Sequence, residues 1–150
     1  LATMDEIRAV VGAEKRFSRD DRRALDRLMD ELAAADLLEA QELYVELFDR
    51  GRATSLHLFE HVHGDSRDRG QAMVDLKAVY ARAGLTLTTN ELPDYLPAVL
   101  EYLSTRPLEE VADMLGDCAH ILRAVGEALG RRRSGYAAIF GALLAVAGEK

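Results

Sequence analysis

The sequence has few of the residues on which cross-linked or membrane-embedded folds depend. It contains one cysteine, Cys118, and no tryptophan. A single thiol cannot form a disulfide within the chain, and it fits a reducing compartment. Apolar runs are only a few residues long and 30% of the residues are charged, so no segment could cross a bilayer. We therefore expect a soluble, cytoplasmic protein.

Positive charge is also scarce. Nineteen Lys and Arg against 26 Asp and Glu give a formal net charge of −7, and residues 91–117 alone hold seven acids and one base. Nucleic-acid binding depends on clustered Lys and Arg at the phosphate backbone, so the charge balance argues against a nucleic-acid partner. An acidic surface suits a basic ligand instead.

The length of 150 residues suits one domain with a single core. Because the sequence opens at Leu1 without an initiator methionine, we expect residues of the full-length protein to be missing at the N-terminus. A separate expectation is that some C-terminal residues are missing as well. We treat residues 1–150 as a single helical domain.

The first half of the chain shows helical periodicity with clear start signals. Ser18 predicts the cap of an amphipathic helix through Leu32, and Asp36 predicts the cap of a second helix that Gly51 ends. A shorter helix is expected from about Leu56 to residues 63–64. No pair of alternating segments joined by an Asn-Gly or Asp-Gly turn predicts a hairpin, and residues 85–88 are the only short strand candidate.

The second half continues in the same way. Ser66 predicts the cap of a helix that Gly84 ends, and prolines at 93 and 97 predict the entrance of a helix that runs to about Ser104. Residues 107–129 are predicted to form one longer helix, and residues 136–146 the last one. The predicted fold is all-α, a single-domain bundle of about seven or eight helices.

One histidine run is compatible with zinc chemistry. His57, Glu60 and His61 match the H-x-x-E-H order of inverted zinc peptidases. A catalytic zinc also needs a third protein ligand, and no partner helix with a suitable residue follows. We favour histidines that form hydrogen bonds beside the core, with a zinc-dependent hydrolase as the alternative.

Other enzyme signatures are missing from the sequence. It has no phosphate-binding loop, no G-x-S-x-G elbow and no G-x-G-x-x-G turn, and Cys118 falls within a predicted helix where a small core residue is expected. We therefore expect a protein without catalytic residues, resident metal or cofactor.

Two acidic clusters differ from an ordinary amphipathic helix. At 44–49, an aromatic-rich helix end places Glu46 and Asp49 three residues apart. At 91–103, Glu91 and Asp94 precede an apolar stripe that includes Leu96 and Leu100. The acids also favour a helix N-terminus, and the leucines also suit a core. An apolar groove edged with acids would bind a basic, partly apolar peptide.

Four motifs follow one another in the chain: YVELFD at 44–49, SLHL at 55–58, HGDSRDRG at 63–70 and ELPDYLPAVLE at 91–101. In this order they resemble the NarJ-type nitrate reductase molybdenum cofactor assembly chaperones, a family related to the TorD and DmsD redox-enzyme maturation chaperones. The similarity covers about residues 37–103. A tyrosine, Tyr95, stands where the family often has histidine.

This resemblance implies an all-helical chaperone that is not an enzyme. It implies that the partner is the alpha subunit of a respiratory nitrate reductase, whose N-terminal segment is bound and kept competent for molybdenum cofactor insertion before membrane attachment. The residues that we expect to contact that peptide combine aromatic and aliphatic side chains with acids: Tyr44, Glu46, Phe48, Asp49, Glu91, Asp94, Leu96 and Leu100. A plain helical interaction scaffold is the other alternative to the chaperone.

Overall fold

The computed structural model describes residues 3–62, 67–88 and 90–149, and these form a bundle of α-helices. Within these ranges no strand is formed, although an isolated antiparallel bridge joins His57 to Tyr95. None of the helices in the same ranges is both long and apolar enough to cross a membrane. The all-α prediction is confirmed. The helical elements are α1 (Met4–Ala13), α2 (Arg19–Ala34), α3 (Leu37–Tyr44) with a π-turn (Val45–Asp49), a 3₁₀ turn (Leu58–His61), α4 (Arg67–Arg82), α5 (Leu96–Leu103), α6 (Leu108–Asp117), α7 (Ala119–Arg131) and α8 (Ala137–Val146).

Several predicted helix ends are present. The Ser18 hydroxyl accepts a hydrogen bond from the Asp21 amide at 3.0 Å, and the Asp21 carboxylate accepts one from the Ser18 amide at 2.9 Å, which together form a capping box. Asp36 caps α3 through the Glu39 amide. Gly84 ends α4 with φ +78°, a conformation that glycine adopts without strain. The predicted cap Ser66 and the predicted stop at residues 63–64 lie outside the described residues.

The prediction of one long helix over 107–129 is wrong. The chain turns at Cys118, where φ −107° and ψ 16° separate α6 from α7. Leu115 and Leu122, on either side of the turn, are both buried, so the apolar spacing continues through the break and conceals it in the sequence. The turn lets α6 and α7 both pack against α8. A second difference is α1, which was not predicted from the sequence.

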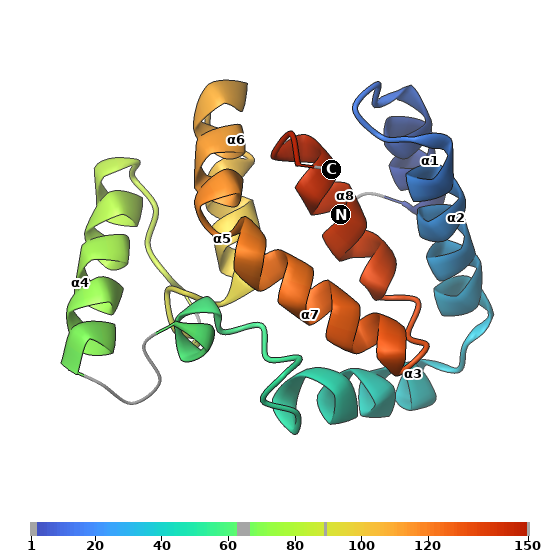
Figure 1. The fold of residues 1–150 in the computed structure, drawn as a ribbon, viewed down its shortest axis with the longest axis horizontal. Coiled ribbons are helices and arrows are strands. Elements are labelled where there is room, and N and C mark those ends of the chain that lie inside the picture. The colour runs from blue at the N-terminus through green and yellow to red at the C-terminus, as the bar shows by residue number, and fades with distance from the viewer. Residues whose placement is uncertain (1–2, 63–66, 89, 150) are drawn as a thin grey trace.

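Helix α7 lies at the centre of the core. Leu122, Val125 and Leu129 on α7 are almost completely buried, and α8 packs along it. A Cβ at Gly126 would lie only 3.0 Å from Phe140 Cβ, so glycine permits the close approach of the two helices. Helices α1 and α2 form an outer layer on the other side of α8, as Figure 1 shows.

Helix α4 stands apart from this bundle, at the left of Figure 1, and has one fully buried side chain. That side chain is Tyr80, whose hydroxyl donates a hydrogen bond of 2.7 Å to the carbonyl oxygen of Pro93. Burial raises the pKa of Tyr80 well above its ordinary value, so the phenol stays protonated and remains a donor. Tyr80 therefore fastens α4 to the segment that leads into α5, and a hollow lies between the two.

Candidate functional site

The hollow between the connector after α4 and the outer face of α5 is the candidate site, and we call it the α5 groove. It has a volume of about 320 Å³. Its lining combines aromatic and small side chains with two acids: Tyr80, Leu85, Thr86, Leu87, Thr88, Glu91, Tyr95, Pro97, Ala98, Glu101 and Tyr102.

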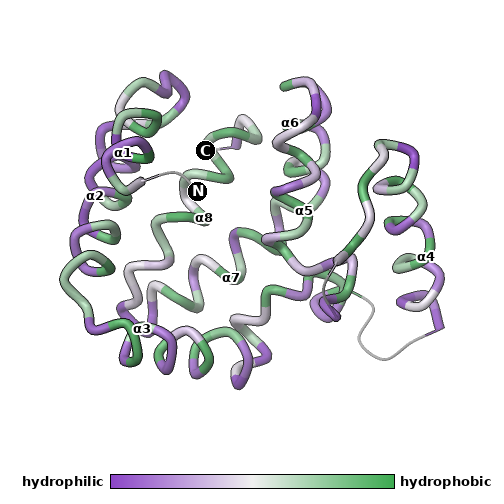
Figure 2. Tube along the Cα trace, turned by 180° about the vertical axis from the view of Figure 1, so that it is seen from behind, coloured by the Kyte–Doolittle hydropathy of each residue, from purple (hydrophilic) through white to green (hydrophobic). Residues whose placement is uncertain are grey.

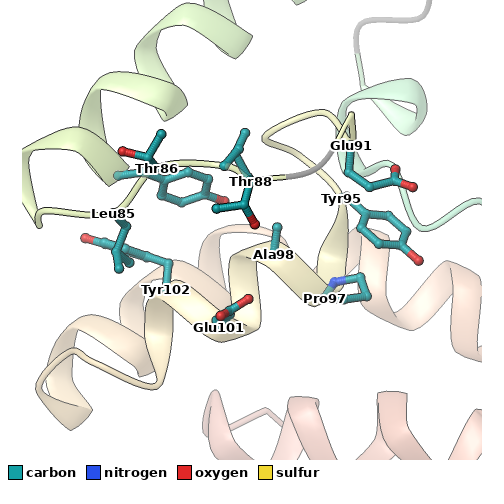
Figure 3. A pocket seen from close by; sticks show the side chains of 11 residues that line it. Leu85, Thr86, Thr88, Glu91, Tyr95, Pro97, Ala98, Glu101 and Tyr102 are labelled. Carbon is teal, nitrogen blue, oxygen red and sulfur yellow. The ribbon is translucent and has the colours of Figure 1, made fainter.

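The α5 groove has two walls, and two acidic side chains lie at different positions along it. In Figure 3, Thr86 and Thr88 come from the connector, whereas Ala98 and Glu101 come from α5. Glu91 lies near Tyr95, where the chain enters α5. Carboxylates on an apolar lining attract a cationic side chain and leave room for apolar neighbours. The arrangement therefore suits a ligand that is both basic and apolar.

Two of the tyrosines that line the groove, Tyr80 and Tyr102, pack against each other. The rings of Tyr80 and Tyr102 lie 5.2 Å apart, and the Tyr102 hydroxyl donates a hydrogen bond of 2.6 Å to Glu110. Arg106 pairs with the same carboxylate at 2.9 Å. The hydrogen bond that Tyr102 donates lowers the pKa of Glu110, and the pairing with Arg106 lowers it further. The same hydrogen bond raises the pKa of Tyr102, because the phenol must keep its proton to donate it. The aromatic wall is therefore held in one position.

A tyrosine from each acidic cluster, Tyr44 of residues 44–49 and Tyr95 of residues 91–103, joins the two clusters. The Tyr44 and Tyr95 hydroxyls lie 2.6 Å apart, within a hydrogen bond. Burial, and then the bond to Tyr95, raises the pKa of Tyr44 well above its ordinary value. The Leu96 amide also donates to the Leu56 carbonyl at 2.8 Å. Segments 44–49, 55–58 and 91–101 thus meet at one place, beside the α5 groove.

Asp94 is fully buried, with 0% of its side chain exposed. Its carboxylate accepts a hydrogen bond of 2.9 Å from the Phe59 amide and lies 3.4 Å from His57 Nδ1. Its backbone oxygen accepts from the Leu58 amide. Asp94 therefore fastens the start of α5 to the 3₁₀ turn, and it does not face the groove.

The remaining residues predicted to contact peptide are divided between core and surface. Phe48 and Leu96 are only 6% and 3% exposed, and Leu100 is half-buried against the same core. Glu46 and Asp49 are exposed but line other hollows, along α3 and beside the 3₁₀ turn. Of the eight predicted residues, Glu91 lines the groove directly and Tyr44 reaches it through Tyr95.

Other groove residues were not predicted from the sequence. Tyr80 and Tyr102 carry the spacing of core positions, and both are largely buried, so the sequence gives no signal that their edges line a hollow. Glu101 belongs to the acidic segment 91–117, and that excess of charge was the available signal. Thr86 and Thr88 belong to the only strand candidate, which the structure shows as an irregular connector.

The histidine run has a geometry unlike that of a helical zinc motif. His57 precedes the 3₁₀ turn in an extended conformation, and its Nε2 lies 3.9 Å from Glu91. His61 Nε2 lies 2.9 Å from the Ser55 carbonyl oxygen, to which it donates a hydrogen bond. Among residues 3–62, 67–88 and 90–149, no group of three or more His, Cys, Asp or Glu side chains is placed to hold a metal.

Comparison with known proteins agrees with the resemblance of the motifs. The family model described as nitrate reductase delta subunit matches residues 14–141. The chain is 51% identical over 142 residues, 95% of its length, to the nitrate reductase molybdenum cofactor assembly chaperone NarJ of Escherichia coli K12. It is also 51% identical over 131 residues, 87% of its length, to the probable chaperone NarW of the same strain. A probable chaperone NarJ of Bacillus subtilis is 33% identical over 104 residues, 69% of the chain.

These matches cover 60%, 57% and 56% of the three relatives, so the chain spans somewhat over half of their length. The family model itself covers most of the chain, from the end of α1 into α8. The chain therefore belongs to the nitrate reductase delta subunit family.

Proposed function

We propose that the chain is an assembly chaperone for a respiratory nitrate reductase and acts in the cytoplasm. In this proposal it binds the N-terminal segment of the catalytic alpha subunit and keeps that subunit competent for molybdenum cofactor insertion before membrane attachment. The relatives are named as nitrate reductase molybdenum cofactor assembly chaperones, which supports the role. The protein acts by binding and carries out no reaction.

The observation that carries the proposal is the α5 groove, an apolar hollow with Glu91 and Glu101 on its lining. A basic, partly apolar tail would place apolar side chains against the tyrosines and a cation near the carboxylates. The net charge of −6 over residues 91–117 attracts such a tail over a longer range.

The predicted contact residues take different roles in this proposal. Glu91 contacts the peptide, and Tyr44 positions Tyr95 at the groove. Asp94, Phe48 and Leu96 hold the walls in place from within the core. Leu100 supports α5, whereas Glu46 and Asp49 reach only a peptide that extends beyond the groove.

Fluorescence anisotropy with a labelled peptide from the alpha-subunit N-terminus tests this assignment. The double variant Glu91→Lys/Glu101→Lys should weaken binding by about tenfold or more, because two attractive charges become repulsive. Binding of the unaltered chain should also weaken as salt rises.

Glu42→Lys/Glu127→Lys is the matched control. Both side chains are exposed, on α3 and α7, and neither lines the α5 groove or belongs to residues 91–117, so the control makes the same change in net charge elsewhere. If both double variants bind the peptide as the unaltered chain does, the α5 groove is not the peptide site. If the unaltered chain shows no preference for this peptide over a scrambled one, a plain helical scaffold explains the fold better.

A further inference from the structure

A second hollow lies between the end of α2, helix α3 and the connector from α7 to α8, and we call it the α3 groove. It has a volume of about 270 Å³ and shares no lining residue with the α5 groove. Its lining has an apolar floor and a charged rim: Leu28, Glu31, Leu32, Ala35, Ala40, Leu43, Glu46, Leu47, Arg132, Arg133, Ser134, Gly135 and Tyr136.

The floor of the α3 groove continues into exposed apolar surface. Leu28 and Leu47 are buried at the base, while Leu43 at the mouth is 51% exposed. Leu37, three residues before Ala40 and on the same side of α3, is 71% exposed. Figure 2 shows apolar and polar stretches alternating along α3. Exposed leucines that extend the lining of a hollow are typical of an interaction surface.

The rim on the connector side is basic. Arg131, Arg132 and Arg133 are exposed, and in the part of the chain that the structure describes none of them takes part in an ion pair. Arg133 has φ +56°, an uncommon conformation for a residue with a side chain. The three consecutive arginines concentrate positive charge at one place on a chain of net charge −7.

The opposite walls carry Glu31, on α2, and Glu46, on α3. The groove therefore has a basic side with two arginines and an acidic side with two glutamates, and the leucines lie between them. A helix with an apolar stripe and carboxylates along one edge fits such a surface, because its acids can face the arginines.

We propose that the α3 groove binds an acidic amphipathic helix of a partner protein, separately from the basic tail assigned to the α5 groove. A concave site of this size accepts one or two large apolar side chains, whereas a membrane surface would have to approach Glu39, Glu42 and Glu46 on α3. A helix can turn its carboxylates toward the arginines alone, whereas an anionic bilayer would also meet those acids, so the observations favour a helix over a lipid surface.

The test uses two synthetic, fluorescein-labelled helices of about 18 residues, long enough to form several turns. Both carry leucines at i, i+3, i+4 and i+7; one has glutamates along one edge of the stripe, and the other has lysines in their place. The acidic helix should bind the chain about tenfold more tightly than the basic helix. Arg132→Glu/Arg133→Glu should remove or reverse this preference, and Leu43→Asp should weaken binding of the acidic helix.

Arg19→Glu/Arg23→Glu is the matched control, because both arginines are exposed on α2 and neither lines the groove. Circular dichroism melting confirms that each variant is folded before binding is measured. An α-subunit peptide short enough to fill only the α5 groove should not displace the acidic helix, which separates this proposal from the function assigned to the α5 groove.

Equal binding of the two helices, or no effect of the rim variants, would overturn the proposal. Two further measurements identify a different occupant. If the chain self-associates in sedimentation and Leu43→Asp abolishes this, the groove binds a second copy of the chain. If the chain binds vesicles with about 30% phosphatidylglycerol and Arg132→Glu/Arg133→Glu abolishes this, the groove binds a membrane surface. Either result would replace the partner helix.

Discussion

Replacing Asp94 with alanine should destabilise the fold before it affects any ligand. The carboxylate is fully buried and accepts the Phe59 amide at 2.9 Å, with His57 Nδ1 at 3.4 Å. A hydrogen bond to a charged group contributes about 1.5–3 kcal/mol, and a buried group that loses its partner adds a desolvation cost. We expect Asp94→Ala to lower the free energy of unfolding by about 2–4 kcal/mol, the higher end reflecting both contacts.

Urea denaturation followed by circular dichroism measures this change, and Asp94→Asn is the matched control. Asparagine keeps an oxygen that can accept the Phe59 amide, so its cost should be about 1 kcal/mol. A loss of less than about 0.5 kcal/mol for Asp94→Ala would refute the structural role, since surface substitutions usually fall in that range. A variant of unchanged stability with weakened peptide binding would instead support direct contact between Asp94 and the peptide.

Two further predictions concern a helix start and the cysteine. Ser18→Ala removes one half of the capping box with Asp21 and should cost about 1 kcal/mol in urea denaturation, whereas Ser18→Asp should cost much less; equal losses would contradict the cap. Burial raises the pKa of the Cys118 thiol to about 11. Because the thiolate is the nucleophile, alkylation by iodoacetamide at a pH of about 8 should be roughly 100-fold slower than in the unfolded chain, and equal rates would contradict the burial.

Local signals in the sequence predicted much of the fold. Ser18 and Asp36 cap helices through hydrogen bonds between near neighbours, and Gly84 adopts a positive φ, so each is decided within a few residues. The turn at Cys118 is different, because it depends on how α6 and α7 pack against α8. Apolar spacing that runs through a turn cannot reveal it.

The sequence predicted the acidic character of the candidate site, but it did not predict which side chains line the groove. Excess acid over residues 91–117 indicated Glu91, which lines the α5 groove. The same pattern did not distinguish Asp94, which is buried by contacts with residues more than thirty positions earlier in the chain. Tyr80 lines the groove from another helix, and only tertiary packing brings it beside Tyr102.

Co-purification with the catalytic subunit tests the proposed function most directly. The chain is expressed with the tagged alpha subunit of a nitrate reductase, before cofactor insertion, and the complex is collected on the tag. We expect the unaltered chain and the control Glu42→Lys/Glu127→Lys to be recovered with the subunit, and Glu91→Lys/Glu101→Lys to be largely lost. Two results would contradict the proposed function. One is equal recovery of all three chains. The other is recovery of the unaltered chain with an alpha subunit that lacks its N-terminal segment.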